Sequence, residues 1–166
     1  YFTLRRRMVA PSIALTVMVA LAALQAGVSG GWVLGLASGG RFVLAAAAMT
    51  VALATWYAVF RVPFAMALVA LGVFATVVAV QVSGGSMPDN PADFFLLTVA
   101  GPWAWITVMV GAGILAAALW FDMSDPHRVG RRSATGFWLH VVAAPAIVNT
   151  IALSLLEMEP CGAFAG

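Results

Sequence analysis

The sequence is poor in charge and nearly free of cysteine. Only 8% of its 166 residues are charged, lysine is absent, and Cys161 is the single cysteine. A soluble globular domain carries about 25% charged residues, so this chain lacks the polar side chains that a water-facing surface of its size needs. One cysteine excludes an internal disulfide and a cysteine-based metal cluster. These shortages exclude soluble enzymes, nucleic-acid-binding proteins and disordered chains.

Most of the sequence is apolar: 63% of the residues are apolar, and the mean hydropathy is +1.03. About 20 apolar residues in a helix cross a hydrocarbon layer of about 30 Å. Four stretches have that length, residues 8–28, 42–60, 62–82 and 135–156, and a fifth, 94–121, is longer. Because backbone groups exposed to lipid must be paired within the chain, we predict an all-α transmembrane bundle of five spans, forming one domain over residues 1–166.

The fourth span carries a start signal ahead of its apolar run. Asn90 can cap a helix that has Pro91 at its first position and Asp93 in its first turn. The apolar run is too long for one crossing and too short for two. We therefore expect this helix to begin in the headgroup region near residue 94 and to cross the membrane mainly from Pro102 to Trp120.

The arginines indicate the orientation of the spans, because cytoplasmic loops of membrane proteins are enriched in basic residues. With the N-terminus in the cytoplasm, only Arg41 falls outside, and seven arginines fall inside: Arg5, Arg6, Arg7, Arg61, Arg128, Arg131 and Arg132. We expect a bacterial inner-membrane protein with a cytoplasmic N-terminus and a periplasmic C-terminus. Arg128, Arg131 and Arg132 are also expected to contact anionic lipid head groups or a partner.

A glycine repeat follows the first apolar run, with Gly27, Gly31, Gly35 and Gly39 at four-residue spacing. On a helix these residues would form a smooth stripe that lets another helix approach closely. One interpretation is a packing face for another copy or another subunit. The alternative is a flexible outer loop, because glycine disfavours helix and Ser29, Gly30 and Ser38 add turn character.

His140 is the main polar candidate inside a span, within the sequence FWLHVVAAP that also contains Trp138. A histidine in hydrocarbon is a functional candidate, and its imidazole could ligate a haem or chlorophyll-type metal. The alternative is a histidine that only donates a hydrogen bond to a neighbouring helix. Pro145 should disturb the same helix. Asn149 lies nine residues beyond His140, so the two side chains face opposite ways on a straight helix.

The predicted inner loop over residues 122–132 contains Asp122, Asp125 and His127 within six residues. Their spacing matches no dedicated zinc or calcium pattern, and Asp125–Pro126 is typical of a turn, so no metal site is expected. The middle of each span lacks charged residues, which ion- and proton-coupled transporters usually need. No converging set of histidine and acidic residues is present either, so we expect no catalytic residues and no enzymatic activity.

Residues 121–148, FDMSDPHRVGRRSATGFWLHVVAAPAIV, resemble a segment of uncharacterised bacterial multi-pass inner-membrane proteins. In those proteins an FD…DP…R…RRS loop precedes an FWLHxxAAPxIV helix. The resemblance covers about one sixth of the chain and implies an inner-membrane location without implying an activity. Such proteins often continue with a histidine where this chain has Asn149.

Together these features predict a non-catalytic accessory or packing subunit of a larger membrane assembly. The expected partners are the lipid bilayer, anionic lipids, other membrane subunits or further copies of the chain, with no nucleic acid and no resident cofactor. One alternative is a small transporter or channel that acts as a homo-oligomer. A third interpretation, which depends on His140 alone, is a haem- or pigment-associated subunit of an electron-transfer complex.

Overall fold

The chain is an all-helical protein in the parts described by the computed structural model, residues 9–88, 90–97, 102–124 and 130–158. Five of the helices in these ranges are long and apolar enough to cross a membrane. With a short 3-10 helix, they are α1 (Val9–Val33), α2 (Ser38–Phe60), α3 (Pro63–Ser83), η1 (Pro91–Phe94), α4 (Trp103–Met123) and α5 (Arg131–Met158). The prediction of five apolar helices is therefore confirmed.

The expected start of the fourth helix near residue 94 is wrong, whereas its expected crossing from Pro102 to Trp120 agrees with α4, which runs from Trp103 to Met123. Asn90 and Asp93 do form a capping box, but the helix they start is η1, which ends at Phe94, and α4 begins only at Trp103. The residues that follow η1 find hydrogen-bond partners on α5 instead of in a helix: the Leu97 amide donates to Ser154 Oγ at 2.9 Å. Pro102 stands directly before α4, a position at which the missing backbone N–H of proline costs no helical hydrogen bond.

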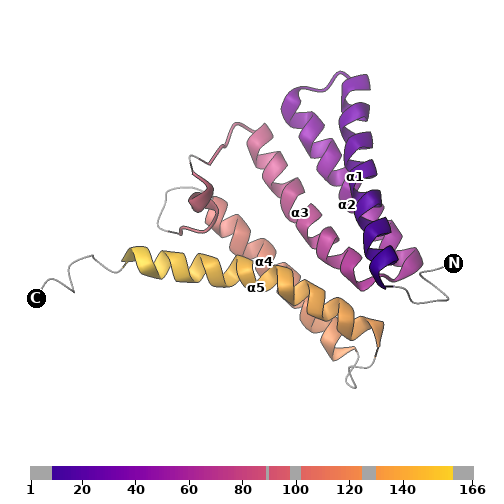
Figure 1. Cartoon of the computed structure of the whole chain (residues 1–166). Helices are drawn as coiled ribbons and strands as arrows, with labels where there is room; N and C mark the ends of the chain where they lie inside the picture. Colours follow the sequence, from indigo (N-terminus) through magenta and orange to yellow (C-terminus); the bar gives the residue numbers. More distant parts are fainter. Residues whose placement is uncertain (1–8, 89, 98–101, 125–129, 159–166) are drawn as a thin grey trace, which may run out of the picture.

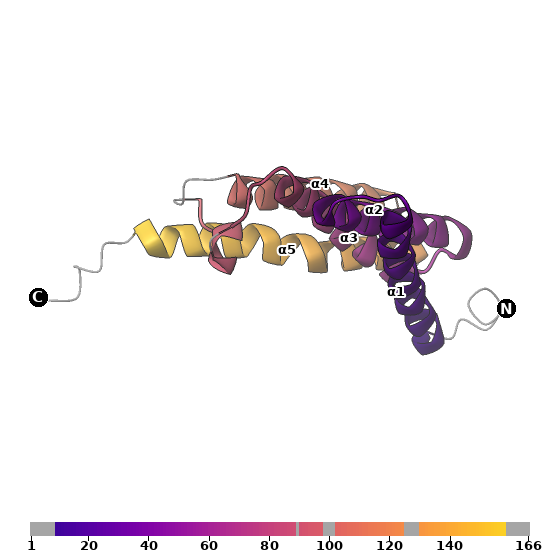
Figure 2. The same ribbon diagram turned by 90° about the horizontal axis from the view of Figure 1, so that it is seen from above.

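The helices form two groups (Figures 1 and 2). Helices α1, α2 and α3 are antiparallel neighbours in one group, and α4 and α5 form an antiparallel pair in the other. The groups converge where α3 and α5 begin, and Figure 1 shows α3 and α5 diverging toward their other ends. Near the convergence Arg131 Nη1 donates to the Phe60 carbonyl at 3.4 Å. We call this side of the bundle the arginine end, and the side that holds η1 the η1 end.

Glycines allow the close approach of helices within the first group. A Cβ added at Gly27 of α1 would collide with the Ala45 Cα of α2, and one added at Gly72 of α3 would collide with the Thr50 hydroxyl. The Thr50 hydroxyl donates to the Ala46 carbonyl at 2.8 Å within its own helix. The Ala45 backbone and the Thr50 hydroxyl therefore occupy the space that a larger side chain would need. Close packing at these two glycines holds α1, α2 and α3 together.

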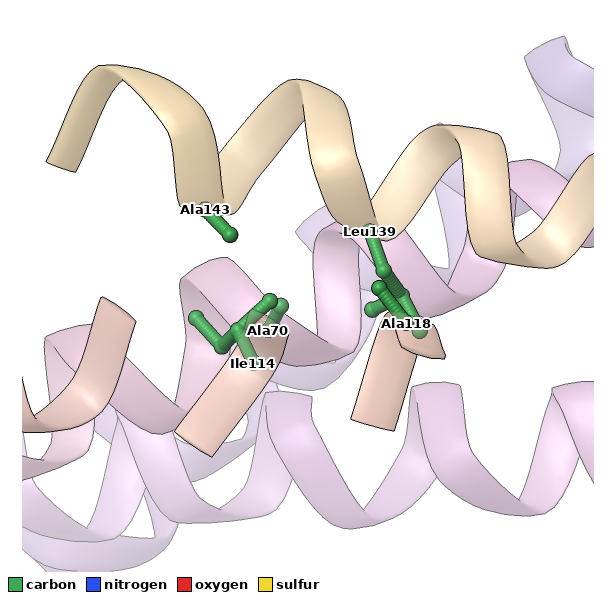
Figure 3. Close-up of a cluster of buried hydrophobic side chains, with 5 residues drawn as sticks. All are labelled: Ala70, Ile114, Ala118, Leu139 and Ala143. Atoms are coloured by element: carbon green, nitrogen blue, oxygen red, sulfur yellow. The ribbon is translucent and has the colours of Figure 1, made fainter. Parts of the chain in front are cut away.

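The two groups meet in a small apolar cluster, shown in Figure 3. The cluster contains one α3 residue, two α4 residues and two α5 residues: Ala70, Ile114, Ala118, Leu139 and Ala143. Beside it, an apolar groove of about 300 Å³ runs between α3 and α4, with Met66 and Val73 on one wall and Val110 and Gly113 on the other. The two groups are thus joined at the arginine end and less tightly packed along the groove.

Replacing Gly27 with alanine should destabilise the protein, because the new Cβ meets the backbone of Ala45. Overpacking of this kind costs about 1–3 kcal/mol, and we expect a lower melting temperature in detergent. Gly30→Ala is the matched control on the same helix, since its Cβ would meet only the end of Leu44 at 4.0 Å. Equal melting temperatures of the two variants would contradict close contact between Gly27 of α1 and Ala45 of α2.

Candidate functional site

The strongest candidate site is a hydrogen-bonded pair of ionisable side chains that joins the two helices of the second group. His140 Nε2 of α5 lies 2.9 Å from Asp122 Oδ2 of α4. Both side chains are partly buried, with exposed fractions of 35% for His140 and 24% for Asp122. When the carboxylate is ionised, only the ring nitrogen can supply a proton, so Nε2–H donates to Oδ2. This hydrogen bond links α4 to α5.

The prediction that Asp122 lies in a loop is wrong, because α4 continues through Met123. The carboxylate is accommodated by Gly136 of α5. A Cβ added at Gly136 would collide with Asp122 Oδ1 and would lie 3.3 Å from the Ala118 carbonyl oxygen. Side chains on a helix lean toward its N-terminus, so the His140 ring extends back over the turn that contains Gly136. The glycine thus leaves the space in which carboxylate and imidazole meet.

Aromatic and hydroxyl groups near the arginine end join the second helix group to the first. Tyr57 Oη of α2 lies 3.4 Å from Thr135 Oγ1 of α5, and its ring contacts Phe121 of α4 edge-on at 6.3 Å. The Phe64 ring of α3 contacts Trp138 of α5 at 5.0 Å. The sequence-predicted site residue Trp138 therefore lies in the contact between α3 and α5, where it helps join the two helix groups.

A metal centre receives little support from this geometry. Within the described ranges, no group of three or more histidine, cysteine, aspartate or glutamate residues could hold a metal ion. Asp125 and His127 lie outside the described residues. Axial ligation of a haem or chlorophyll-type metal through His140 Nε2 would compete with the bond to Asp122. The arrangement is suited to holding two helices together.

Asn149 is not brought together with His140. Its side chain is exposed on the outer surface of α5, whereas His140 faces α4 through Asp122. Helix α5 continues through Pro145 from Arg131 to Met158, so the proline does not turn Asn149 toward the pair. The polar cavity that a translocation path between His140 and Asn149 would need is therefore not formed by these two side chains.

The four glycines of the repeat do not form one stripe. Gly27 and Gly31 lie on α1 and face α2 of the same chain, Gly35 lies in the turn between the helices with a φ of +68°, and Gly39 lies at the start of α2. A Cβ added at Gly39 would lie 2.8 Å from the Ser83 side chain of α3. The repeat thus combines close helix contact with a turn, and the contacts it makes here are inside the chain.

The arginines expected to contact lipid lie near the start of α5. Arg131 and Arg132 are exposed, and Arg131 donates to the Phe60 carbonyl at the end of α2. Arg128 lies outside the described residues.

The contact between Asp122 and His140 can be tested by a double-mutant cycle with Asp122→Ala, His140→Ala and the double variant. We expect each single variant to lower the free energy of unfolding, and a coupling energy of about 0.5–3 kcal/mol because the two side chains contact directly. The measurement is reversible unfolding in detergent or bicelles. Additive effects of the two substitutions would contradict a direct bond between Asp122 and His140.

Gly136→Ala should destabilise the protein because its Cβ displaces the Asp122 carboxylate. The loss should shrink when Asp122 is already alanine, since the obstructing oxygen is then absent. Gly113→Ala is the control, because a Cβ there meets no atom within 4 Å. The measurement is the melting temperature of Gly136→Ala, Asp122→Ala, Gly113→Ala and the double variant Gly136→Ala, Asp122→Ala. An equal loss of stability with and without Asp122→Ala would show that the effect of Gly136→Ala is independent of Asp122.

Comparison with known proteins yields no relative. No protein-family model matches the chain, and no curated protein or solved structure is similar to it. Fold, exposed surfaces and the chemistry of the described side chains are therefore the grounds on which a function can be assigned.

Proposed function

We propose that the chain is a non-catalytic packing subunit that assembles laterally with other membrane subunits. The observation that carries this proposal is how little of each helix the chain covers itself. Between 17 and 22% of the residues in the apolar stretch of each helix are buried within the chain. Large side chains face outward from separate helices, with exposed fractions of 65% for Met18, 65% for Val51 and 70% for Met109.

The state of the ionisable groups supports a packing role over transport. Asp122 and His140 are bonded to each other, and the guanidinium of Arg41 lies 3.7 Å from the centre of the Trp32 ring. A carrier of ions or protons keeps an ionisable group available to its cargo near the middle of the membrane. Here the groups are engaged with partners near the helix ends, where they stabilise the bundle.

The proposal includes a location in a bacterial inner membrane, with the arginine end in the cytoplasm, the N-terminus inside and the C-terminus outside. The support is the distribution of arginine: Arg61, Arg131 and Arg132 lie at the arginine end, and Arg41 lies at the start of α2 near the other end. Basic residues concentrate on the cytoplasmic side. In this orientation Arg131 and Arg132 reach the phosphates of anionic lipids.

Native mass spectrometry of the protein, gently extracted from its own membranes, tests the proposal. We expect it to be extracted together with larger membrane subunits in a fixed stoichiometry. We also expect bound anionic lipids, and fewer of them on the Arg131→Ala, Arg132→Ala double variant. A coloured preparation with a haem or pigment spectrum would indicate a cofactor subunit instead. Recovery without any other subunit, together with flux of a solute in proteoliposomes, would replace the proposal by a transporter.

A further inference from the structure

Asn149 is a polar side chain on the outer surface of a helix that can cross the membrane. It lies seven residues before Leu156, the end of the apolar stretch of α5, which corresponds to about 10 Å along the helix axis. Its side chain is exposed, and no hydrogen bond to it is formed by the other residues that the structure describes. In hydrocarbon, an amide in this position lacks water as a partner.

The face of α5 that contains Asn149 is opposite the face that packs on α4. The inward face includes Ala143, Thr150 and Ser154, which are buried. The outward face carries Pro145, Asn149, Ala152 and Leu156, all exposed, at spacings of four, three and four residues. This spacing is the one with which a helix presents a continuous seam to a neighbouring helix. We call these four residues the Asn149 seam.

The asparagine is complementary to the same residue of a second copy. Copies of one chain inserted in the same orientation are related by an axis normal to the membrane, so a residue next to that axis meets its own copy at the same depth. An asparagine side chain is both donor and acceptor, so two copies can exchange amide-to-carbonyl hydrogen bonds. An asparagine in the seam of two helices fixes their register in this way.

We infer that the Asn149 seam is the contact through which α5 binds α5 of a second copy of the chain. Ala152, one turn beyond Asn149, is small enough to let the two helices approach closely. The inference rests on the proposed lateral assembly and specifies one of its partners. Contact between the two Asn149 side-chain amides across the axis supplies the hydrogen bonds that Asn149 lacks within the described chain.

Disulfide cross-linking in intact membranes tests the seam. In a Cys161→Ser background, Ala152→Cys retains Asn149 and places one thiol on the seam, where two copies next to the axis come within the Cα separation of about 4–7 Å that a disulfide requires. We expect a cross-linked dimer after oxidation. The matched control is Ile151→Cys, the neighbouring residue, which is 50% exposed but turned about 100° away from the seam. We expect little dimer from this control.

Adding Asn149→Leu to the Ala152→Cys protein should raise the dissociation constant of the dimer about three- to twenty-fold, the range expected for one interhelical hydrogen bond in a membrane. Asn149→Gln should retain part of the dimer because it keeps the amide. Resonance energy transfer between labelled copies in liposomes measures this constant. Because Asn149 is exposed, the variants should keep the fold of the monomer, and this is verified from equal melting temperatures at a dilution in detergent where all variants are monomeric.

Equal cross-linking at residues 151 and 152, a heterologous protein linked to residue 152, or no effect of Asn149→Leu would overturn the inference. The result can be separated from that of the proposed function. If other subunits are recovered by native mass spectrometry while residue 152 fails to cross-link, the seam is wrong and the packing role stands. If residue 152 cross-links while no other subunit is recovered, the seam stands and the larger assembly is wrong.

Discussion

Close contact between helix backbones at small residues is the constraint on which the fold depends. Lipid is as apolar as the helices themselves, so the hydrophobic effect gives little drive for one helix to leave lipid for another. Packing contacts and hydrogen bonds must hold the bundle together. Each main helix pair accordingly has a glycine at its contact, with Gly27 between α1 and α2, Gly72 between α2 and α3, and Gly111 between α4 and α5. Along the groove between α3 and α4, Met66, Val73 and Val110 line the walls, and the two helices are less closely packed.

The same close contact leaves little room for polar groups, and most of them are satisfied locally. The buried hydroxyls of Thr16, Thr107 and Thr150 donate to the carbonyl four residues earlier in their own helix. Such bonds connect no helices and need no partner chain. The Asp122–His140 pair differs because it joins two helices at a glycine, and Asn149 differs because its own helix surface leaves it exposed. Polar side chains also join helices at a few other places in the described ranges: Trp56 Nε1 of α2 donates to Thr16 Oγ1 of α1 at 3.2 Å, and Tyr57 Oη of α2 lies 3.4 Å from Thr135 Oγ1 of α5.

The apolar runs are sufficient to predict five helices, because crossing hydrocarbon requires both length and apolarity. They could not predict the break after η1, since residues 95–97 are as apolar as a span and their backbone is satisfied by Ser154, a contact distant in sequence. Asp122 was also beyond prediction: a carboxylate at the end of an apolar run resembles a loop residue until Gly136 and His140 are seen opposite it. Regular spacing of glycines likewise concealed a turn, because Gly35 adopts a positive φ between two helices.

The order of helix contacts has a consequence for synthesis of the protein. Helix α1 contacts α2, α2 contacts α3, and α4 contacts α5, so most packing is between neighbours along the chain. The main contact between helices distant in sequence joins α3 and α5. As the chain leaves the ribosome, α1 to α3 can therefore pack before α4 has been made, while the groove wall of α3 still faces lipid. Docking of the completed α4–α5 hairpin, with Trp138 against Phe64, is then the last step of assembly.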